Sequence, residues 1–404
     1  MEHAEVSVMG EEGWRLGSAE VVESLCTACT IVADIEHDSG DIDAAAMPGQ
    51  WISLSIPSLV PERPRRYVGG VITRWEQTDS HVKREGGSVY RVHAASPIEL
   101  MSLRRQTRQF NHKSVLEICS QLFDEWGDRI FASLSGAMMV TDQEPSSIQL
   151  QHARQVRESD LQFVRRLLNQ AGVFTMQTYT GPAADDSTLQ LGTFSRAASP
   201  WADSLAFQYQ PVGESVQFDH QISRWQKEAN LGPTIPVIAT WHGAVADNHL
   251  PSNASVMATS PSSPSFHGWE YIDHTLGAPR AGMRMTELRD GLSKVREQAL
   301  AIEYAWRHGL STSAAIVPGC SINPQGLPHD DAGPFFVTAS RLIVLGESYS
   351  QMLDLDMPVR CAFTAIPLHT PFRPPSRLER LEPPDRNQVE LAQALDRLVA
   401  QEMA

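Results

Sequence analysis

Strand-type patterns near both ends of the chain, separated by helix-type patterns, constrain its fold most. Residues 51–56 (WISLSI) alternate apolar and hydroxyl side chains, as a half-buried strand does. Residues 67–72 and 88–94 predict two further strands, and Pro57 lies between strands, where a missing N–H costs nothing. Residues 1–97 therefore predict a small antiparallel barrel or curled sheet.

Helix-type patterns begin at Pro97, a residue that the first turn of a helix tolerates. Ser114 is expected to cap a helix that ends at Trp126, and Glu117, three residues after the cap, completes a capping box. The clearest helix covers residues 158–168, with acids at its start and arginines later, which complements the helix dipole. Its apolar face consists of Leu161, Val164, Leu167 and Leu168.

Strand patterns return at residues 173–178 and 188–192, and again at 335–344 and 359–367. Between them, residues 285–308 predict a helix. The apolar residues near one face of this helix are Leu288, Leu292, Val295, Ala299 and Ile302. A chain of 404 residues can form two to four compact units, so the sequence predicts an α+β, multi-domain fold.

Two segments interrupt the regular patterns. Residues 251–268 are rich in Pro, Ser and Asn and predict a loop, and residues 371–384 are rich in proline. The proline-rich stretch leads to an amphipathic helix at about 386–403, whose apolar stripe must be covered by something. Either it docks on its own chain, or it serves as a handle for a partner protein. The stripe consists of Leu391, Leu395, Leu398 and Val399.

Composition excludes several classes of protein. The formal net charge of −15 argues against a nucleic-acid or anionic-membrane partner, because both require a basic face. Five cysteines are too few, and odd in number, for a disulfide framework. The N-terminus lacks the basic and apolar regions of a signal peptide, and no stretch approaches a membrane span. We expect synthesis and folding in the cytoplasm, and any export in a particle without a signal peptide.

Few residues form patterns typical of metal binding. Cys26 and Cys29 form a lone C-x-x-C without the two further ligands that a structural zinc requires, and we expect ordinary small residues on or beside a strand. Residues 34–40 are similar to a calcium loop, but Ala45 stands where the bidentate glutamate is needed, so they predict a solvated acidic turn. The basic run at residues 63–66 predicts a solvated loop rather than a binding patch.

Catalytic motifs are missing as well. No nucleophile elbow, zinc-protease motif, phosphate-binding loop or dinucleotide fingerprint is present. Trp241, His242 and Asp247 would suit a hydrolase acting on sugars or cell wall, although packed turn residues are the favoured interpretation. The sequence therefore predicts a protein that is not an enzyme, with no catalytic, cofactor-binding or metal-binding residues.

Three stretches of the chain resemble the VgrG-type spike proteins of the type VI secretion system. The first covers residues 66–111, with Asn111 where the family usually has glutamine. The second, residues 155–174, is similar to the family's E-S-D helix signature and is the most specific match. The third runs from 318 to 374 and ends in an F-x-A-I-P and R-P pattern. The matching residues are Arg66, Gly69, Gly70, Val71, Arg104, Arg108, Phe110, Arg157, Glu158, Ser159, Asp160, Phe163, Arg166, Leu167, Leu168, Gly172, Pro318, Gly319, Phe363, Ile366, Pro367, Pro371, Arg373 and Pro374.

The resemblance implies a hub related to contractile-phage baseplate hubs, with two β-barrel-like tube domains per chain and inserted α/β segments. Three copies would form a trimer of quasi-sixfold shape, which adapts a sixfold tail-tube ring (Hcp in type VI systems) to a threefold spike. The spike domains that follow R-P in the family have no counterpart in this sequence. The alternatives are a hub fragment, a split-gene hub, or a spikeless adaptor that binds an effector or a separate spike chain.

The same resemblance suggests limits for the domains. The expected parts are a first tube-type barrel at 1–112, a helix-rich α+β insertion at 113–194, a second insertion at 195–329, closing strands of the second tube domain at 330–374, and a proline-rich linker with a terminal helix at 375–404.

Overall fold

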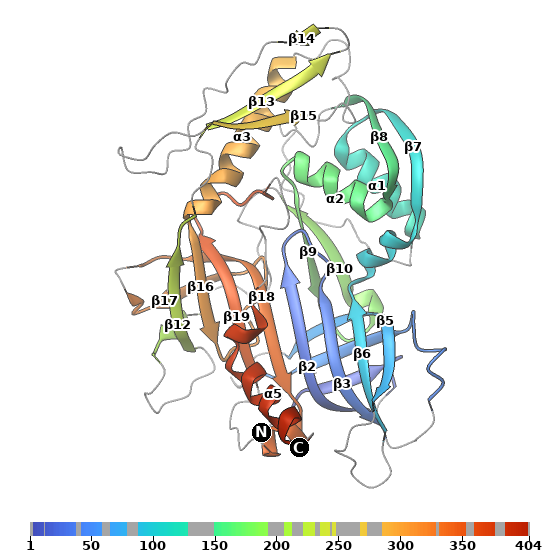
Figure 1. The fold of residues 1–404 in the computed structure, drawn as a ribbon, viewed down its shortest axis with the longest axis vertical. Helices are drawn as coiled ribbons and strands as arrows, with labels where there is room; N and C mark the ends of the chain where they lie inside the picture. Colours follow the sequence, from blue (N-terminus) through green and yellow to red (C-terminus); the bar gives the residue numbers. More distant parts are fainter. Residues whose placement is uncertain are drawn as a thin grey trace.

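A computed structural model shows how these patterns assemble (Figure 1). It describes residues 3–11, 13–37, 42–58, 65–78, 88–127, 149–192, 206–211, 221–230, 235–242, 245–247, 267–272, 285–328, 331–352, 359–375 and 384–402. Among these residues, no helix is both long and apolar enough to cross a membrane.

The N-terminal region forms a curled antiparallel sheet of six strands in the order β1-β4-β5-β6-β3-β2, which we call the first ring. Its strands are β1 (Glu5–Val8), β2 (Arg15–Ser24), β3 (Thr30–His37), β4 (Trp51–Ile56), β5 (Arg66–Thr78) and β6 (Ser88–Ala95). The strands predicted at 51–56, 67–72 and 88–94 are therefore confirmed as β4, β5 and β6. Apolar side chains on one face of each strand, such as Ile52 and Leu54, fill the interior of the ring.

A second ring is fully closed by hydrogen bonds, in the order β18-β17-β11-β12-β16-β19 and back to β18. Its strands are β11 (Ala206–Tyr209), β12 (Gln221–Glu228), β16 (Trp306–Ser311), β17 (Ser321–Gln325), β18 (Phe335–Leu345) and β19 (Val359–Pro367). Strands β18 and β19 confirm the predictions at 335–344 and 359–367. The other four strands come from residues 206–325, all of which the sequence assigned to the second insertion. The domain limits as such stay a prediction.

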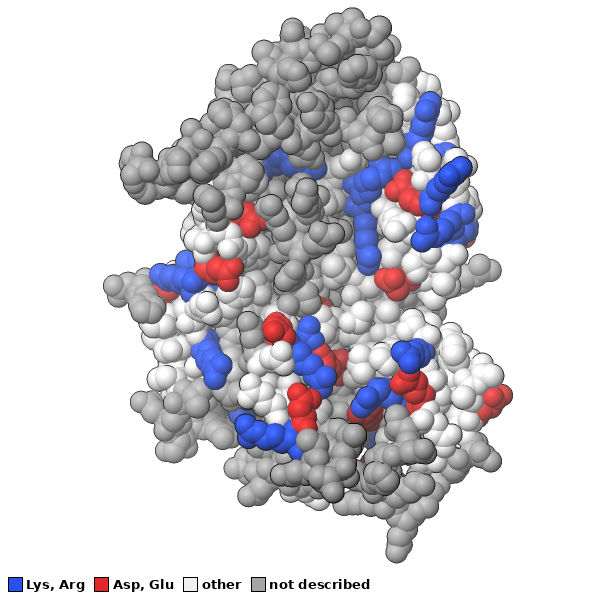
Figure 2. Space-filling view, in the orientation of Figure 1, with Lys and Arg blue, Asp and Glu red and all other residues white. Residues whose placement is uncertain are grey.

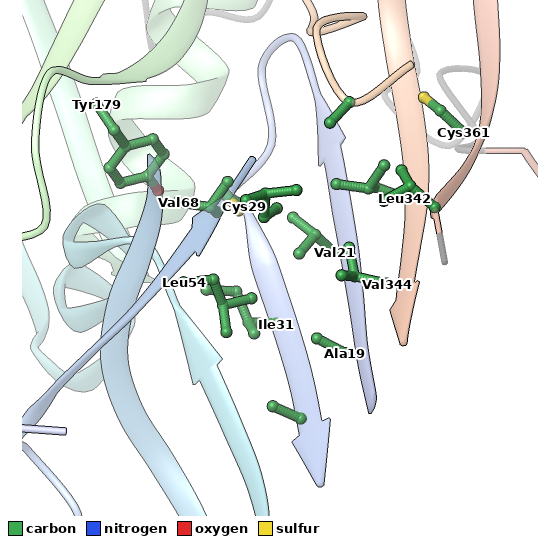
Figure 3. Packing of buried hydrophobic residues seen from close by; sticks show 14 of the residues in the cluster. Ala19, Val21, Cys29, Ile31, Leu54, Val68, Tyr179, Leu342, Val344 and Cys361 are labelled. Carbon is green, nitrogen blue, oxygen red and sulfur yellow. The ribbon is translucent and has the colours of Figure 1, made fainter. Parts of the chain in front are cut away.

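Strand β18 joins the two rings. Its residues 339–345 pair antiparallel with residues 18–24 of β2, so the rings form one 12-stranded sheet. Figure 3 shows Val21 of β2 beside Leu342 and Val344 of β18, in a single apolar core that continues to Ile31 of the first ring. Because this core spans both rings, burial on one side of the junction stabilises the other.

The C-terminal helix α5 (Glu390–Glu402) covers the outer face of β18 and β19 (Figure 1). It follows a short 3-10 turn, η9 (Arg386–Gln388), and packs near α4 (Glu347–Met352). Leu391 and Leu395 are buried in one cluster with Ile343 and Leu345. This part of the apolar stripe therefore packs against its own chain. The alternative, that the stripe binds a partner protein, is wrong for these two buried residues. The side chains of Leu398 and Val399 lie outside the described residues.

A helix-rich lobe stands beside the rings. It contains η1 (Pro97–Leu103), a ribbon of β7 (Arg105–Lys113) and β8 (Leu150–Ser159), α1 (Val115–Trp126) and α2 (Asp160–Gln170). Ser114 caps α1 and forms the predicted capping box with Glu117. The helix predicted to start at 158 begins instead at Asp160, because Glu158 and Ser159 pair with β7 and Ser159 caps the helix.

The remaining described elements are a β-hairpin and a second lobe. The β9–β10 hairpin (Phe174–Tyr179 and Ser187–Gly192, with the turn η4, Ala184–Asp186) confirms the two strands predicted there. The second lobe contains α3 (Met285–Ala301), η6 (Ile302–Tyr304) and the sheet β14-β13-β15 (Val245–Asp247, Ile235–His242 and His267–Ile272). The helix predicted to reach 308 ends at Ala301, because residues 306–311 pair as β16 with β12 and β19. The predicted loop lies outside the described residues up to 266, and its last two residues begin β15.

Candidate functional site

The side chain of Asp160, the first residue of α2, is fully buried at the centre of the helix-rich lobe. Its Oδ1 accepts hydrogen bonds from Arg108 Nη2 at 3.0 Å and from Gln155 Nε2 at 2.8 Å. Its Oδ2 accepts from Trp126 Nε1 at 3.0 Å and from Arg104 Nε. Four donors from the η1–β7 junction, β7, α1 and β8 therefore converge on one carboxylate, which we call the Asp160 cluster.

Glu125 completes the charge balance of the Asp160 cluster. Its carboxylate accepts from Arg104 Nη2 and from Arg108 Nη1, each at 2.8 Å. The guanidinium of Arg104 also lies 5.0 Å from the ring centroid of Trp126, within the range of a cation–π contact. Two acids and two arginines are thus held in fixed positions, which locks α1 and α2 to the ribbon.

The hydrogen bonds keep Asp160 ionised despite its burial. Burial raises the pKa of this carboxyl, but hydrogen bonds from Gln155, Trp126 and Arg104 and the charge of Arg108 together lower it below the ordinary value. Both oxygens are occupied by donors from the protein. The carboxylate is therefore a structural anchor and is poorly suited to take a proton from a substrate.

Asp160 makes the stability of the lobe depend on pH. Because its folded pKa is lower than its unfolded value of about 3.9, its contribution is present above that pH and is lost as the pH falls through the folded pKa. We expect the free energy of unfolding to fall more steeply with acidification in the wild type than in Asp160→Asn. Urea unfolding followed by circular dichroism between pH 7 and pH 3 measures both slopes. Equal slopes for the wild type and the variant would contradict the assignment of this pH dependence to Asp160.

A second buried ion pair lies where the rings meet. Arg66 on β5 and Glu23 on β2 are each less than 10% exposed and form a direct ion pair. Arg66 Nη1 also donates to the carbonyl oxygen of Ala314 at 2.6 Å, in the segment after β16, and Ser340 of β18 donates to Glu23. The basic run at 63–66 was predicted as a solvated loop, and for Arg66 this is wrong, because the residue begins a strand and its charge is neutralised inside the protein.

Buried thiols surround this ion pair. The pKa of Cys320 is raised to about 12, chiefly because burial disfavours the thiolate. Burial likewise raises the pKa of Cys29 well above its ordinary value, and the nearby Glu23 carboxylate adds to this rise. The pKa of Cys26 is raised to about 12 by burial. The C-x-x-C cysteines are thus neutral and free, and the described residues contain no group of three or more His, Cys, Asp or Glu arranged to hold a metal.

A third contact joins the second and third resembling stretches. Gly172, after the end of α2, has φ of +75°, a conformation that glycine adopts without strain. Arg373 is buried and donates from Nη1 to the carbonyl oxygen of Gly172 at 3.0 Å and from Nε to Gln298 at 2.8 Å. A Cβ at position 172 would lie 2.6 Å from a methyl group of Val295 on α3. One glycine therefore allows α2, α3 and the chain after β19 to meet.

The other residues of the resembling stretches are mostly buried. A Cβ on Gly69 would lie 2.3 Å from the Trp51 ring, one on Gly70 2.7 Å from the carbonyl oxygen of Ala95, and one on Gly319 2.4 Å from the sulfur of Met176. The other buried residues of the resembling stretches are Val71, Phe110, Phe163, Leu167, Leu168, Phe363, Ile366 and Pro374. Those partly buried are Pro318, Pro367 and Pro371. Glu158 pairs with Arg166 at 2.6 Å, and Arg157 is exposed.

Sequence reasoning missed several partners of these residues. Glu23, Glu125 and Trp126 help to complete the two charge clusters but belong to none of the resembling stretches. Gln155 begins the second stretch but is not one of the matching residues. Glu23 gives no clear signal in the sequence, because the same strand also contains Glu20, which is only partly buried. Residues 34–40 were predicted to form a solvated acidic turn, and for residues 34–37 this is wrong, because they belong to β3, where Asp34 pairs with Arg91 at 2.8 Å. Residues 38–40 lie outside the described residues. The side chains of Trp241, His242 and Asp247 also lie outside them.

Comparison with known families gives a consistent result. The sequence profile of a family described as phage tail baseplate hub (GPD) matches residues 22–344, which is most of the chain. None of the curated protein sequences gives a significant match.

Solved structures share the fold at low sequence identity. The c3393 protein of E. coli, described as a type VI secretion component with structural similarity to the T4 bacteriophage tail proteins gp27 and gp5, has a TM-score of 0.59 and 15% identity, covering 92% of this chain and 79% of its own. A tail protein of Neisseria meningitidis MC58 has a TM-score of 0.59 and 11% identity, covering 90% and 97%. A chain of the Francisella PdpA–VgrG complex has a TM-score of 0.56 and 9% identity, covering 92% and 59%. The α+β architecture with two β-barrel-like units is therefore that of baseplate hubs.

Proposed function

The chain belongs to the phage tail baseplate hub (GPD) family, and we propose that it acts as a trimeric hub that adapts a sixfold tail tube to a threefold spike. A VgrG-like structural protein of this kind works through its shape. Its surfaces must fit other subunits, and its interior must hold these surfaces in fixed positions.

One observation carries the proposal: a single chain contains two six-stranded rings joined edge to edge through β2 and β18. Three copies of such a chain would place six rings around one axis. That number matches a sixfold tail-tube ring of the Hcp type, while the chain symmetry stays threefold. The spike, on the same or a separate chain, would dock on the threefold side.

The interior clusters support a structural role. The Asp160 cluster, the Arg66–Glu23 pair and the Arg373–Gly172 contact each join elements that are far apart in the sequence. We assign the residues of the resembling stretches, apart from the exposed Arg157, to this joining role, and we propose that the protein has no catalytic activity of its own. An adaptor that binds an effector remains compatible with this role, as the Francisella PdpA–VgrG complex illustrates for a protein of the same fold.

Molecular mass tests the proposal directly. We expect light scattering or native mass spectrometry to give three times the chain mass of 44.7 kDa, about 134 kDa, at micromolar concentrations. Addition of a tail-tube ring protein should then produce a larger complex, visible as stacked rings by negative-stain microscopy. A protein that stays monomeric at every concentration, with or without the tube protein, would overturn the proposal.

A further inference from the structure

Large apolar side chains that point into solvent are rare in this structure. Among the described residues, only Leu103 (77% exposed), Val156 (52%) and Met9 (50%) are of this kind. Leu103 and Val156 lie at the same end of the β7–β8 ribbon, while Met9 lies at the free edge of the first ring. Exposed apolar groups that lie together are typical of binding surfaces, whereas single ones are common on any protein.

The first of these surfaces is basic. Leu103 ends η1, Arg105 begins β7, and Thr107 pairs with Val156, beside which Arg157 forms a bulge. Arg105 and Arg157 are exposed, and neither forms an ion pair within the described part of the chain. Figure 2 shows the cations that gather over this lobe. We call Leu103, Arg105, Thr107, Val156 and Arg157 the ribbon patch.

The second surface is a groove along β1. It has a volume of about 970 Å³, and its lining includes Met9, Trp14, Trp51, Tyr67 and Glu5. Strand β1 pairs with β4 on one side only, so its other edge is the free edge of the 12-stranded sheet among the described residues.

Acidic side chains flank this groove. The side chain of Glu5 is 71% exposed and pairs at 3.2 Å with Arg65, which also lines the groove, so the negative charge of the surface comes from Glu5 and Glu11 together outweighing Arg65. Glu11, two residues after Met9, is exposed and forms no ion pair within the described residues. We call the groove with Glu5 and Glu11 the edge groove.

Both surfaces hold a residue in an uncommon backbone conformation. Arg157 has φ of +54° and Met9 has φ of +58°, in the left-handed region that residues other than glycine rarely adopt. The N–H of Arg157 donates to Thr107 Oγ1 at 3.2 Å, and that of Met9 donates to the carbonyl oxygen of Trp51 at 2.8 Å. Each surface thus holds a strained residue with an exposed side chain. His112 on β7 is another such residue, and strained residues cluster at functional sites.

We infer that the ribbon patch of one copy docks in the edge groove of a second copy. Leu103 and Val156 then cover the aromatic lining and Met9, while Arg105 and Arg157 pair with Glu5 and Glu11. Two surfaces of the same chain, opposite in charge and each apolar at its centre, complement one another. A chain of net charge −15 repels its copies, so it requires such a local attraction to associate.

The contact uses different surfaces on the two copies, and a contact of this kind forms a ring when the rotation between copies is one third of a turn. It therefore deepens the proposed trimer and rests on it. The contact lies between the edge of the first ring of one copy and the helix-rich lobe of the next, which gives the insertion a role in assembly.

Charge reversal tests the contact on the full chain. We expect Arg105→Glu with Arg157→Glu to raise the concentration needed for half-assembly at least tenfold, measured by light scattering over a dilution series. Glu5→Arg with Glu11→Arg should do the same. All four substitutions together should restore assembly to within a fewfold of the wild type, since the attraction is then reversed but intact. Arg397→Glu, an exposed arginine on α5 far from the ribbon, is the matched control and should leave assembly unchanged.

Each other outcome overturns a defined part of the inference. A wild-type trimer that the ribbon substitutions leave intact rules out the contact and leaves the trimeric hub standing. Loss of assembly that the fourfold reversal does not restore rules out the edge groove as the receptor. An equal loss in Arg397→Glu shows a general charge effect and rules out the pairing. A wild type that is monomeric at every concentration overturns both the hub trimer and this contact.

Discussion

Replacing Arg66 by methionine is expected to destabilise the protein by about 3 to 5 kcal/mol, the usual cost of removing one partner from a buried ion pair. The substitution keeps an unbranched apolar chain in place of the arginine stem but leaves the carboxylate of Glu23 inside the protein without a cation. The carbonyl oxygen of Ala314 loses its donor as well. Urea unfolding followed by circular dichroism measures the loss.

The double variant Arg66→Met/Glu23→Leu separates the charge from the packing. When both partners are apolar, no buried charge remains, so we expect the double variant to recover most of the stability that the single variant loses. Arg65→Met is the neighbouring control. Arg65 is partly exposed and pairs with the exposed Glu5, so its loss is expected to cost about 1 kcal/mol. A double variant as unstable as the single one would show that the charge is not the cause.

The variant Asp160→Asn is expected to destabilise the helix-rich lobe by about 3 kcal/mol at neutral pH. The amide keeps the size of the carboxylate but removes the charge that Arg104 and Arg108 share. Its NH2 group would also face donors that have no acceptor to spare. Hydrogen–deuterium exchange, read on peptides from α1, α2 and the ribbon, measures the local loss directly.

Glu99→Gln is the control for this prediction in the same lobe. Glu99 pairs with Arg165 at 3.5 Å, and its side chain is 37% exposed, so we expect a loss below about 1 kcal/mol. If exchange in the lobe is equally fast in both variants, the Asp160 cluster stabilises the lobe no more than a surface ion pair does. If only the peptides of the two rings exchange faster in Asp160→Asn, the cluster acts on the rings and not on the lobe.

Much of the local structure could be predicted from single segments. The capping box at Ser114 and Glu117 depends on residues three apart, and the strand at 51–56 depends on alternation within six residues. Both were predicted correctly because neighbours in the sequence decide them. The start of α2 was placed two residues early, because Glu158 has helical neighbours but pairs with Gln106 on a strand more than fifty residues away.

The sequence by itself determined the cap at Ser114, the presence of helices α1, α2, α3 and α5, and the strands β4, β5, β6, β9, β10, β18 and β19. It also determined the resemblance that indicated a baseplate hub, because each of these depends on local periodicity or on the order of short motifs. Only the tertiary structure decided that β11, β12, β16 and β17 close a second ring. It also decided that Glu23 faces Arg66, and that Arg104 and Arg108 share Asp160. The physical reason is that a buried charge is stable only beside its counterion, and the chain brings the two together from distant positions.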